Sequence, residues 1–311
     1  MPMKSARVTQ FGSPDVIQIT NVDIPEPGEG QIRVRVTAAG VGPWDALVRA
    51  GKSGVPQTLP LTLGSDIAGV VDAIGANVAG FRAGDEVYGV TNEQFTGGYA
   101  EYALASAGMI ARKPPVLNFI EAASAPVVAV TAWQMLFEYA RARAGQKVLI
   151  HGGAGNVGAY AVQMAKNASL DVIATASTRD VEYVRSLGAS KVVDYQRQRL
   201  DEVLSPVDIV LDTVGGETRE RSFRVLKPDG ILVSVVSAPF PKESPINGAK
   251  AVFFFVEVTT PRLNILSDLF TNRKISPQVG TVLPLGDARR AHEMLAGAPH
   301  PRGKIVLNIV P

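Results

Sequence analysis

The sequence has 311 residues, with 31 Lys and Arg, 29 Asp and Glu, three His and no Cys, and its formal net charge is +2. This length predicts two domains, each able to bury its own core. A chain without cysteine carries no disulfide, Cys-ligated zinc, iron–sulfur cluster or thiolate nucleophile. Because the positive and negative charges nearly balance, the net charge does not indicate a nucleic-acid partner.

Targeting and membrane signals are weak in this sequence. The first twelve residues, MPMKSARVTQFG, lack the apolar stretch of a signal peptide. The longest uncharged run, between Glu121 and Glu138, is shorter and more polar than a membrane span requires. Because the absence of disulfides also fits a reducing compartment, we expect a soluble, cytoplasmic protein with no membrane partner.

The first 125 residues are rich in Gly and Pro and divide into short strand-like runs. Residues 32–36 alternate apolar with basic side chains, which is typical of a half-exposed strand. Further strands bounded by glycine are expected over residues 69–75, 86–90 and 99–103. This pattern predicts a compact, mostly antiparallel barrel or sandwich.

Residues 126–260 have a different sequence pattern, which predicts alternating strands and helices. A helix over 127–143 precedes Gly145, and apolar strands without alternation follow, as expected for strands buried on both faces of a parallel sheet. The sequence therefore predicts a doubly wound α/β domain here. Its strands are expected at 148–150, 172–174, 192–193, 207–211, 231–236 and 252–258, and its helices at 156–167, 181–187 and 217–226.

The segment after residue 260 does not continue this alternation. Helices are expected at 263–270 and 287–295, and strands at 281–285 and 304–309. We expect these elements to return and complete the first domain, which then comprises residues 1–125 and 261–311.

A glycine loop directly follows the first parallel strand and opens a helix. Gly152, Gly155 and Gly158 are spaced by three within the run from His151 to Gly158. A helix N-terminus offers unpaired N–H groups to a pyrophosphate, and glycine lets the backbone approach the phosphate. This placement favours dinucleotide binding over a merely structural tight turn.

The end of the second strand indicates which dinucleotide is bound. NAD sites usually carry Asp or Glu at this point, whereas this chain has Ser177, Thr178 and Arg179 before the first carboxylate, Asp180. An arginine and hydroxyl donors suit the 2′-phosphate of NADP(H). The alternative is that Arg179 is a solvated first-turn residue and that Ser177 or Thr178 is an N-cap.

Several motifs, in this order, make the chain resemble the zinc-independent medium-chain dehydrogenases/reductases of the quinone oxidoreductase (zeta-crystallin-like) branch. The resemblance covers essentially the whole chain. Besides the glycine loop, it rests on residues 64–71 (GSDIAGVV), 84–87 (GDEV), 98–102 (GYAEY), 187–189 (LGA) before 194–195 (DY), 212–216 (DTVGG) and 303–307 (GKIVL).

This resemblance implies a GroES-like, mostly-β catalytic domain beside a Rossmann dinucleotide-binding domain, a cleft between them and a homodimer. It also implies which positions bind the cofactor. Thr131 is expected near the nicotinamide, and Ser177, Arg179 and Tyr195 are expected around the adenosine ribose and its phosphate. The nicotinamide ribose and carboxamide are expected to contact Val214, Val236, Ser237, Phe255 and Val256, while Asn156, Val157 and Gly158 hold the pyrophosphate.

The positions that hold catalytic zinc in alcohol-oxidising relatives carry other residues here. Gly42 stands in place of a Cys, and Ser65 in place of a His. His151, His292 and His300 show no ligand spacing, so we expect no catalytic metal. Without a Lewis acid, conjugated acceptors such as quinones, enals and enones are favoured as substrates, with hydride supplied by NADPH.

The substrate-binding residues are less well marked, and no catalytic residue is assigned. Quinone-reducing relatives often carry Asn and Tyr where this chain has Gly42 and Leu47. Trp44 and Asp45 are expected at the cleft mouth, and Trp44, Phe95 and Phe254 form either an aromatic slot for a flat substrate or part of the core. The alternatives are an NADPH-binding protein with little turnover, in a structural or sensor role, and a zinc-free alcohol dehydrogenase.

Overall fold

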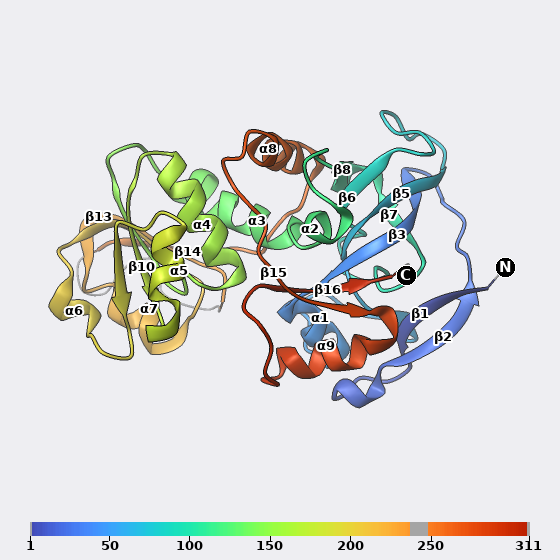
Figure 1. Cartoon of the computed structure of the whole chain (residues 1–311), viewed down its shortest axis with the longest axis horizontal. Helices are drawn as coiled ribbons and strands as arrows, with labels where there is room; N and C mark the ends of the chain where they lie inside the picture. Colours follow the sequence, from blue (N-terminus) through green and yellow to red (C-terminus); the bar gives the residue numbers. More distant parts are fainter. Residues whose placement is uncertain (1, 237–247, 310–311) are drawn as a thin grey trace. The chain divides into compact units, whose positions relative to one another are not determined.

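The computed structural model describes residues 2–236 and 248–309, and its chain forms two compact units. The first unit comprises Met1–Val127, Val258–Arg273 and Pro277–Pro311, and the second comprises Val128–Glu257 and Lys274–Ser276. Figure 1 shows the mostly antiparallel strands of the first unit and the parallel sheet of the second. In the described part of the chain, no helix combines the length and apolarity needed to cross a membrane.

The first unit contains a seven-stranded and a three-stranded sheet. The larger has the order β15-β16-β3-β5-β6-β8, with β7 also paired to β3, and the smaller has the order β2-β1-β4. The strands are β1 (Pro2–Val8), β2 (Gln18–Asp23), β3 (Gln31–Val41), β4 (Leu61–Thr62), β5 (Asp66–Ile74), β6 (Glu86–Val90), β7 (Tyr102–Ser106), β8 (Ile110–Arg112), β15 (Val279–Pro284) and β16 (Lys304–Asn308), and the helices are α1 (Pro43–Arg49), α2 (Phe119–Ala123), α8 (Thr260–Thr271) and α9 (Ala288–Leu295).

Strand β3 shows why the first sheet forms. Its alternating Ile32, Val34 and Val36 are fully buried, while Arg33 faces outward and pairs with Asp72 at 2.7 Å. The C-terminal strand β16 pairs antiparallel with the other end of β3. Strand β16, near the end of the described chain, therefore lies in the same sheet as β3.

The second unit is built on a six-stranded, all-parallel sheet with the order β11-β10-β9-β12-β13-β14. The order reverses between β9 and β12, as in doubly wound folds, so the predicted α/β architecture is confirmed. The strands are β9 (Lys147–Ile150), β10 (Asp171–Ala176), β11 (Lys191–Asp194), β12 (Val207–Asp212), β13 (Leu226–Ser234) and β14 (Lys250–Phe253), and the helices are α3 (Pro126–Trp133), which begins in the first unit, α4 (Asn156–Asn167), α5 (Val181–Ser186), α6 (Leu200–Val203) and α7 (Gly216–Ser222).

Several predicted boundaries differ from the structure. The helix expected over 127–143 is α3 followed by a π-helical stretch, Gln134–Tyr139, and the chain turns at Arg141, whose φ is +50°. Helix α7 ends at Ser222, because residue 226 already begins β13 by pairing with β12. The sixth strand is β14 rather than 252–258, and α6 was not expected.

A short segment of the predicted first domain belongs to the second unit. Residues Lys274–Ser276 bind to α4 through its amide side chains: Gln163 Oε1 accepts from the Ser276 backbone N–H at 2.8 Å, and Asn167 Nδ2 donates to the Lys274 carbonyl. These bonds link positions more than 100 residues apart, which no local sequence pattern indicates.

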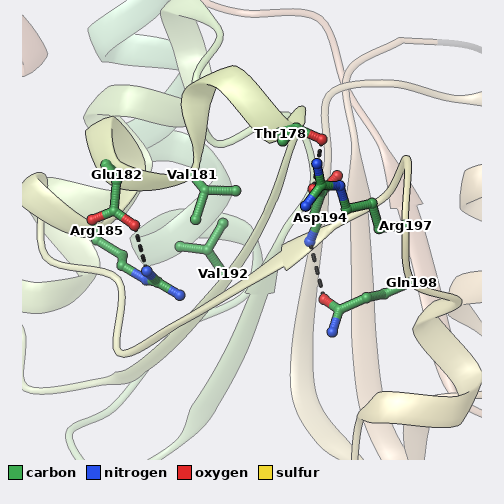
Figure 2. A pocket seen from close by; sticks show the side chains of 8 residues that line it. All are labelled: Thr178, Val181, Glu182, Arg185, Val192, Asp194, Arg197 and Gln198. Carbon is green, nitrogen blue, oxygen red and sulfur yellow. Dashed lines mark hydrogen bonds and ion pairs between the residues drawn. The ribbon is translucent and has the colours of Figure 1, made fainter.

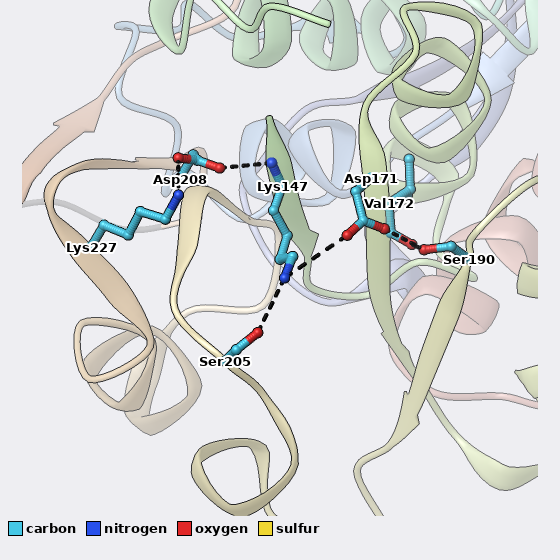
Figure 3. Close-up of polar contacts among 7 residues, drawn as sticks. All are labelled: Lys147, Asp171, Val172, Ser190, Ser205, Asp208 and Lys227. Atoms are coloured by element: carbon cyan, nitrogen blue, oxygen red, sulfur yellow. Dashed lines mark hydrogen bonds and ion pairs between the residues drawn. The ribbon is translucent and has the colours of Figure 1, made fainter. Parts of the chain in front are cut away.

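The amino ends of the parallel strands are held together by charged and polar side chains (Figure 3). Asp208 accepts from the Lys147 backbone N–H at 2.8 Å and from Lys227 Nζ at 2.6 Å. Ser190 donates to Asp171 at 2.7 Å, and Lys147 Nζ donates to Ser205 at 3.1 Å. These side chains bond to one another at the amino edge, whereas ligands of doubly wound sheets bind at the opposite, carboxyl edge.

Candidate functional site

The glycine loop lies at the carboxyl end of β9 and leads into α4. Gly152 has a φ of +67°, which glycine adopts without strain. A Cβ on Gly158 would lie 2.1 Å from the Gly152 carbonyl oxygen, so the first turn of α4 packs directly on the loop only with glycine there. Gly155 is the N-cap and supplies no side-chain acceptor to the first-turn N–H groups. The loop therefore combines a tight turn, a close helix approach and open backbone donors.

A buried histidine anchors this loop. His151 Nε2 lies 2.7 Å from Ser222 Oγ, which itself donates to the Thr218 carbonyl and so accepts from the imidazole. Nδ1 lies 3.3 Å from Thr175 Oγ1, which accepts from the Gly152 N–H. Burial lowers the pKa of His151 to about 4, although Asp212 opposes this shift. His151 is therefore a neutral structural group with both ring nitrogens occupied.

Two carboxylates hold the hydroxyl groups at the tip of β10. Ser177 Oγ donates to Asp180 at 2.6 Å, and Thr178 Oγ1 donates to Asp194 at 2.6 Å. Arg179 Nε lies 3.5 Å from Asp180, and its side chain is 89% exposed. Because both hydroxyl hydrogens are already used, the guanidinium group is the chief remaining donor among the three predicted phosphate-binding side chains.

A second arginine lies at the neighbouring strand end. Arg197 Nε lies 3.7 Å from Asp194, and its side chain is 73% exposed. Figure 2 shows Thr178, Asp194 and Arg197 together at the wall of a cavity of about 390 Å³. Sequence reasoning missed Arg197, although parallel pairing of β10 with β11 brings the residues that follow these two strands close together.

Exposed apolar side chains follow the ends of four strands of the parallel sheet. In the described part of the second unit, the large apolar side chains that are exposed are those of Tyr195, Val214, Val236 and Phe255. Each lies one or two residues beyond β11, β12, β13 or β14, respectively. Phe255 is 76% exposed and meets Phe253 edge-to-face. All four were predicted to contact the cofactor. Val214, Val236 and Phe255 follow the adjacent strands β12, β13 and β14, whereas Tyr195 follows the edge strand β11.

The other predicted cofactor residues are less exposed. Thr131 is buried in α3, and Val256 is half-buried. Asn156 and Val157 are half-buried in the first turn of α4. Ser237 lies outside the described residues.

Two of the residues considered for the substrate cleft are buried. Phe254 is only 6% exposed and stacks on Tyr139 with ring centroids 4.1 Å apart, so it packs in the core of the second unit. Asp45 is fully buried and accepts from the Gly42 N–H at 2.8 Å and Tyr99 Oη at 2.9 Å. Burial raises its pKa to about 7. Phe95 is half-buried in the loop after β6 with a φ of +58°.

In the first unit, the indole of Trp44 and a buried ion pair lie beside Gly42 and Ser65, the positions that were compared with zinc ligands. Trp44 Nε1 donates to Ser65 Oγ at 3.0 Å, and a Cβ on Gly42 would lie 2.3 Å from the Trp44 ring. Lys304 Nζ lies 4.1 Å from the ring centroid and 3.0 Å from Asp66 Oδ2. Asp66 Oδ1 also accepts from a backbone N–H, so this acidic side chain is committed to its neighbours.

Comparisons with known proteins agree with this arrangement. Residues 28–115 match the family model of the alcohol dehydrogenase GroES-like domain, and residues 187–307 match that of the zinc-binding dehydrogenases. The chain is 31% identical to the quinone oxidoreductase of Lama guanicoe over 325 residues, covering 98% of this chain and 97% of the relative.

Two further relatives extend the comparison. The chain is 32% identical to the chloroplastic NADPH-dependent alkenal/one oxidoreductase of Arabidopsis thaliana, covering 99% of this chain and 80% of that protein. The solved structure of the quinone oxidoreductase from Coxiella burnetii is 33% identical and superposes with a TM-score of 0.92, with both chains covered completely. The GroES-like fold expected for the first domain is confirmed by the family match and this superposition.

Proposed function

Because the chain belongs to the quinone oxidoreductase family of the medium-chain dehydrogenases/reductases, we propose that it reduces quinones or α,β-unsaturated carbonyl compounds with NADPH and without zinc. Membership makes the protein an oxidoreductase. The choice of NADPH, the acceptor class and the absence of a metal from the reaction are the parts that we propose.

The carboxyl edge of the parallel sheet is the observation that carries this proposal. One edge combines a glycine loop with open helix N–H groups, two exposed arginines beyond β10 and β11, and exposed apolar side chains beyond four strands. Dinucleotides bind outside the carboxyl ends of the strands in doubly wound sheets. These three kinds of surface suit, respectively, a pyrophosphate, a ribose that carries a phosphate, and a flat nicotinamide ring.

The residues present fit NADPH. The backbone of Asn156, Val157 and Gly158 would hold the pyrophosphate, and the exposed guanidinium of Arg179 would bind the 2′-phosphate. Val214 and Phe255 would exclude water from the nicotinamide. When bound, NADPH supplies the hydride from its C4 carbon.

The donor set does not suit zinc. Gly42 has no side chain, Ser65 Oγ accepts from Trp44, and Asp66 is paired with Lys304. A catalytic zinc requires three protein ligands in an open site, and these groups do not provide it. An acceptor that conjugation already activates needs no Lewis acid, since its developing enolate or quinol oxygen is stabilised by hydrogen-bond donors.

Steady-state NADPH oxidation with a panel of quinones, enals and enones tests this proposal. We expect turnover of a conjugated class, unchanged within about twofold by EDTA because no metal takes part. Gly158→Ala is the control, since its Cβ would collide with the Gly152 carbonyl and abolish turnover with every acceptor. Tight NADPH binding without turnover of any acceptor would instead support the alternative of a cofactor-binding protein.

A further inference from the structure

The segment that follows β11 folds into a tight turn around Asp194. The Asp194 carbonyl accepts from the backbone N–H groups of Arg197 at 3.0 Å and Gln198 at 2.8 Å. Asp194 Oδ1 accepts from the Gln196 N–H at 3.0 Å. The backbone that carries Arg197 is therefore fixed relative to the end of the strand.

The same turn is bonded to the tip of β10. Gln196 Oε1 accepts from the Thr178 N–H at 3.0 Å, and Asp194 Oδ2 accepts from Thr178 Oγ1 at 2.6 Å. Arg197 Nε lies 3.7 Å from that same carboxylate oxygen, so its guanidinium group lies near Thr178 (Figure 2). Because Arg179 follows Thr178 in the chain, two arginines extend from two loops that are bonded to each other.

The guanidinium group of Arg197 has donors to offer. Among the described residues, its partner is Asp194 alone, and the 3.7 Å between Nε and the carboxylate is longer than a hydrogen bond. The side chain is 73% exposed, so its terminal amino groups face solvent and are available to a ligand.

The charges at this tip suit a phosphate only if both arginines take part. The side chains of Asp180 and Asp194 are each 12% exposed, so solvent screens neither carboxylate fully. With Arg179 as the sole cation, one positive charge would face two carboxylates, and the excess negative charge would repel a phosphate of about −1.5 to −2. Arg197 removes this excess.

We propose that Arg197 is a specificity-determining residue that binds the 2′-phosphate of NADPH together with Arg179. This inference rests on the proposed function and adds a residue to its cofactor site. Each arginine fork can donate two parallel N–H bonds to phosphate oxygens, and the two forks come from neighbouring strand ends. NADH has a neutral hydroxyl at this position, so Arg197 favours NADPH through the phosphate alone.

Binding of the two reduced cofactors, followed through their own fluorescence at low salt, tests this assignment. Arg197→Ala is expected to raise the Kd of NADPH about tenfold, the loss expected for an exposed charge-assisted hydrogen bond, and that of NADH by less than about twofold. The double variant that also carries Arg179→Ala should bind NADPH no more tightly than NADH. The matched control is Arg199→Ala, which removes an exposed arginine paired with Glu202 at 3.3 Å and should leave both Kd values unchanged.

A ligand without the nicotinamide isolates the phosphate contact. Adenosine 2′,5′-bisphosphate carries the 2′-phosphate, whereas AMP lacks it. In competition with NADH, we expect the bisphosphate to bind about tenfold more weakly to Arg197→Ala than to the wild type, and AMP to bind equally to both.

Two results would overturn the inference. One is a Kd of NADPH that is unchanged in Arg197→Ala or that rises equally with that of NADH, and the other is equal binding of the bisphosphate to Arg197→Ala and the wild type. A lack of turnover with every acceptor would count against the proposed function instead. Because these binding measurements require no turnover, a selective loss of NADPH affinity would still support the role of Arg197.

Discussion

At the tip of β10, two exposed guanidinium groups lie beside two largely buried carboxylates. Arg179 is near Asp180 and Arg197 is near Asp194, while the adjacent hydroxyls donate to the same carboxylates. A phosphate placed here would meet arginine donors first, because Ser177 and Thr178 must break existing hydrogen bonds to reach it. Cofactor selectivity at this tip therefore depends on arginine more than on the hydroxyls.

Replacing Arg179 with Ala tests this dependence. We predict a rise in KM for NADPH of roughly 10- to 100-fold, the loss expected for a charge-assisted hydrogen bond, and almost no change for NADH. Arg289→Ala, which removes an exposed arginine paired with Glu293 on α9, is the control. Equal effects of Arg179→Ala on the two cofactors would rule out an interaction with the 2′-phosphate.

At the scale of elements, His151 joins the glycine loop to two neighbours. It follows β9, and its ring contacts Thr175 on β10 and Ser222 at the end of α7. Both contacts use the neutral imidazole, in which Nε2 donates and Nδ1 accepts. Protonation would give Nδ1 a hydrogen that faces a buried donor, so acid should weaken the hold on the loop.

The pKa of His151, about 4 when folded and near 6.5 when unfolded, sets the direction of this effect. Between these values the unfolded chain binds the additional proton, so stability falls as the pH is lowered below 6.5. We predict that titration of His151 lowers the free energy of unfolding by about 2 kcal/mol when the pH falls from 8 to 5. Urea unfolding of the wild type and His151→Gln at both pH values measures it, and parallel pH dependences in the two proteins would show that His151 does not titrate in this way.

The elements also show what sequence reasoning can reach. Helix α4 begins and ends where predicted, because the glycine loop and the apolar period mark its residues locally. Helix α7 is shorter than predicted, because pairing of residue 226 with β12 competes with the helical pattern. Lys274–Ser276 depends on hydrogen bonds to α4 that have no local signal. Local chemistry therefore predicts the element type, and long-range pairing decides several boundaries.

The same distinction applies to the candidate site. Tyr195, Val214, Val236 and Phe255 were predicted from a family pattern, and each is exposed one or two residues beyond a strand end. Asp45 was misplaced, because its burial depends on Tyr99, which lies 54 residues away in the sequence. Phe254 is likewise covered by Tyr139 from a distant helix. Exposure and partners are properties of the folded chain that residue type alone does not determine.

For the whole molecule, the two units carry different parts of the proposed chemistry. The second unit offers a dinucleotide edge, and the first offers an indole and a buried ion pair at the positions that hold zinc in alcohol-oxidising relatives. Within the described residues, no group of three or more His, Asp or Glu side chains is arranged to hold a metal ion. The residue types at those positions are the basis on which we propose hydride transfer to a conjugated acceptor rather than oxidation of an alcohol.

The position of the transferred hydride tests this account most directly. With NADPH that carries deuterium at both C4 positions and a cyclic enone as acceptor, we predict a saturated ketone with deuterium at the β-carbon and a solvent proton at the α-carbon. Mass spectrometry and NMR of the product locate the label. Deuterium at the carbonyl carbon, in an allylic alcohol, or a reduced product without any label would contradict it.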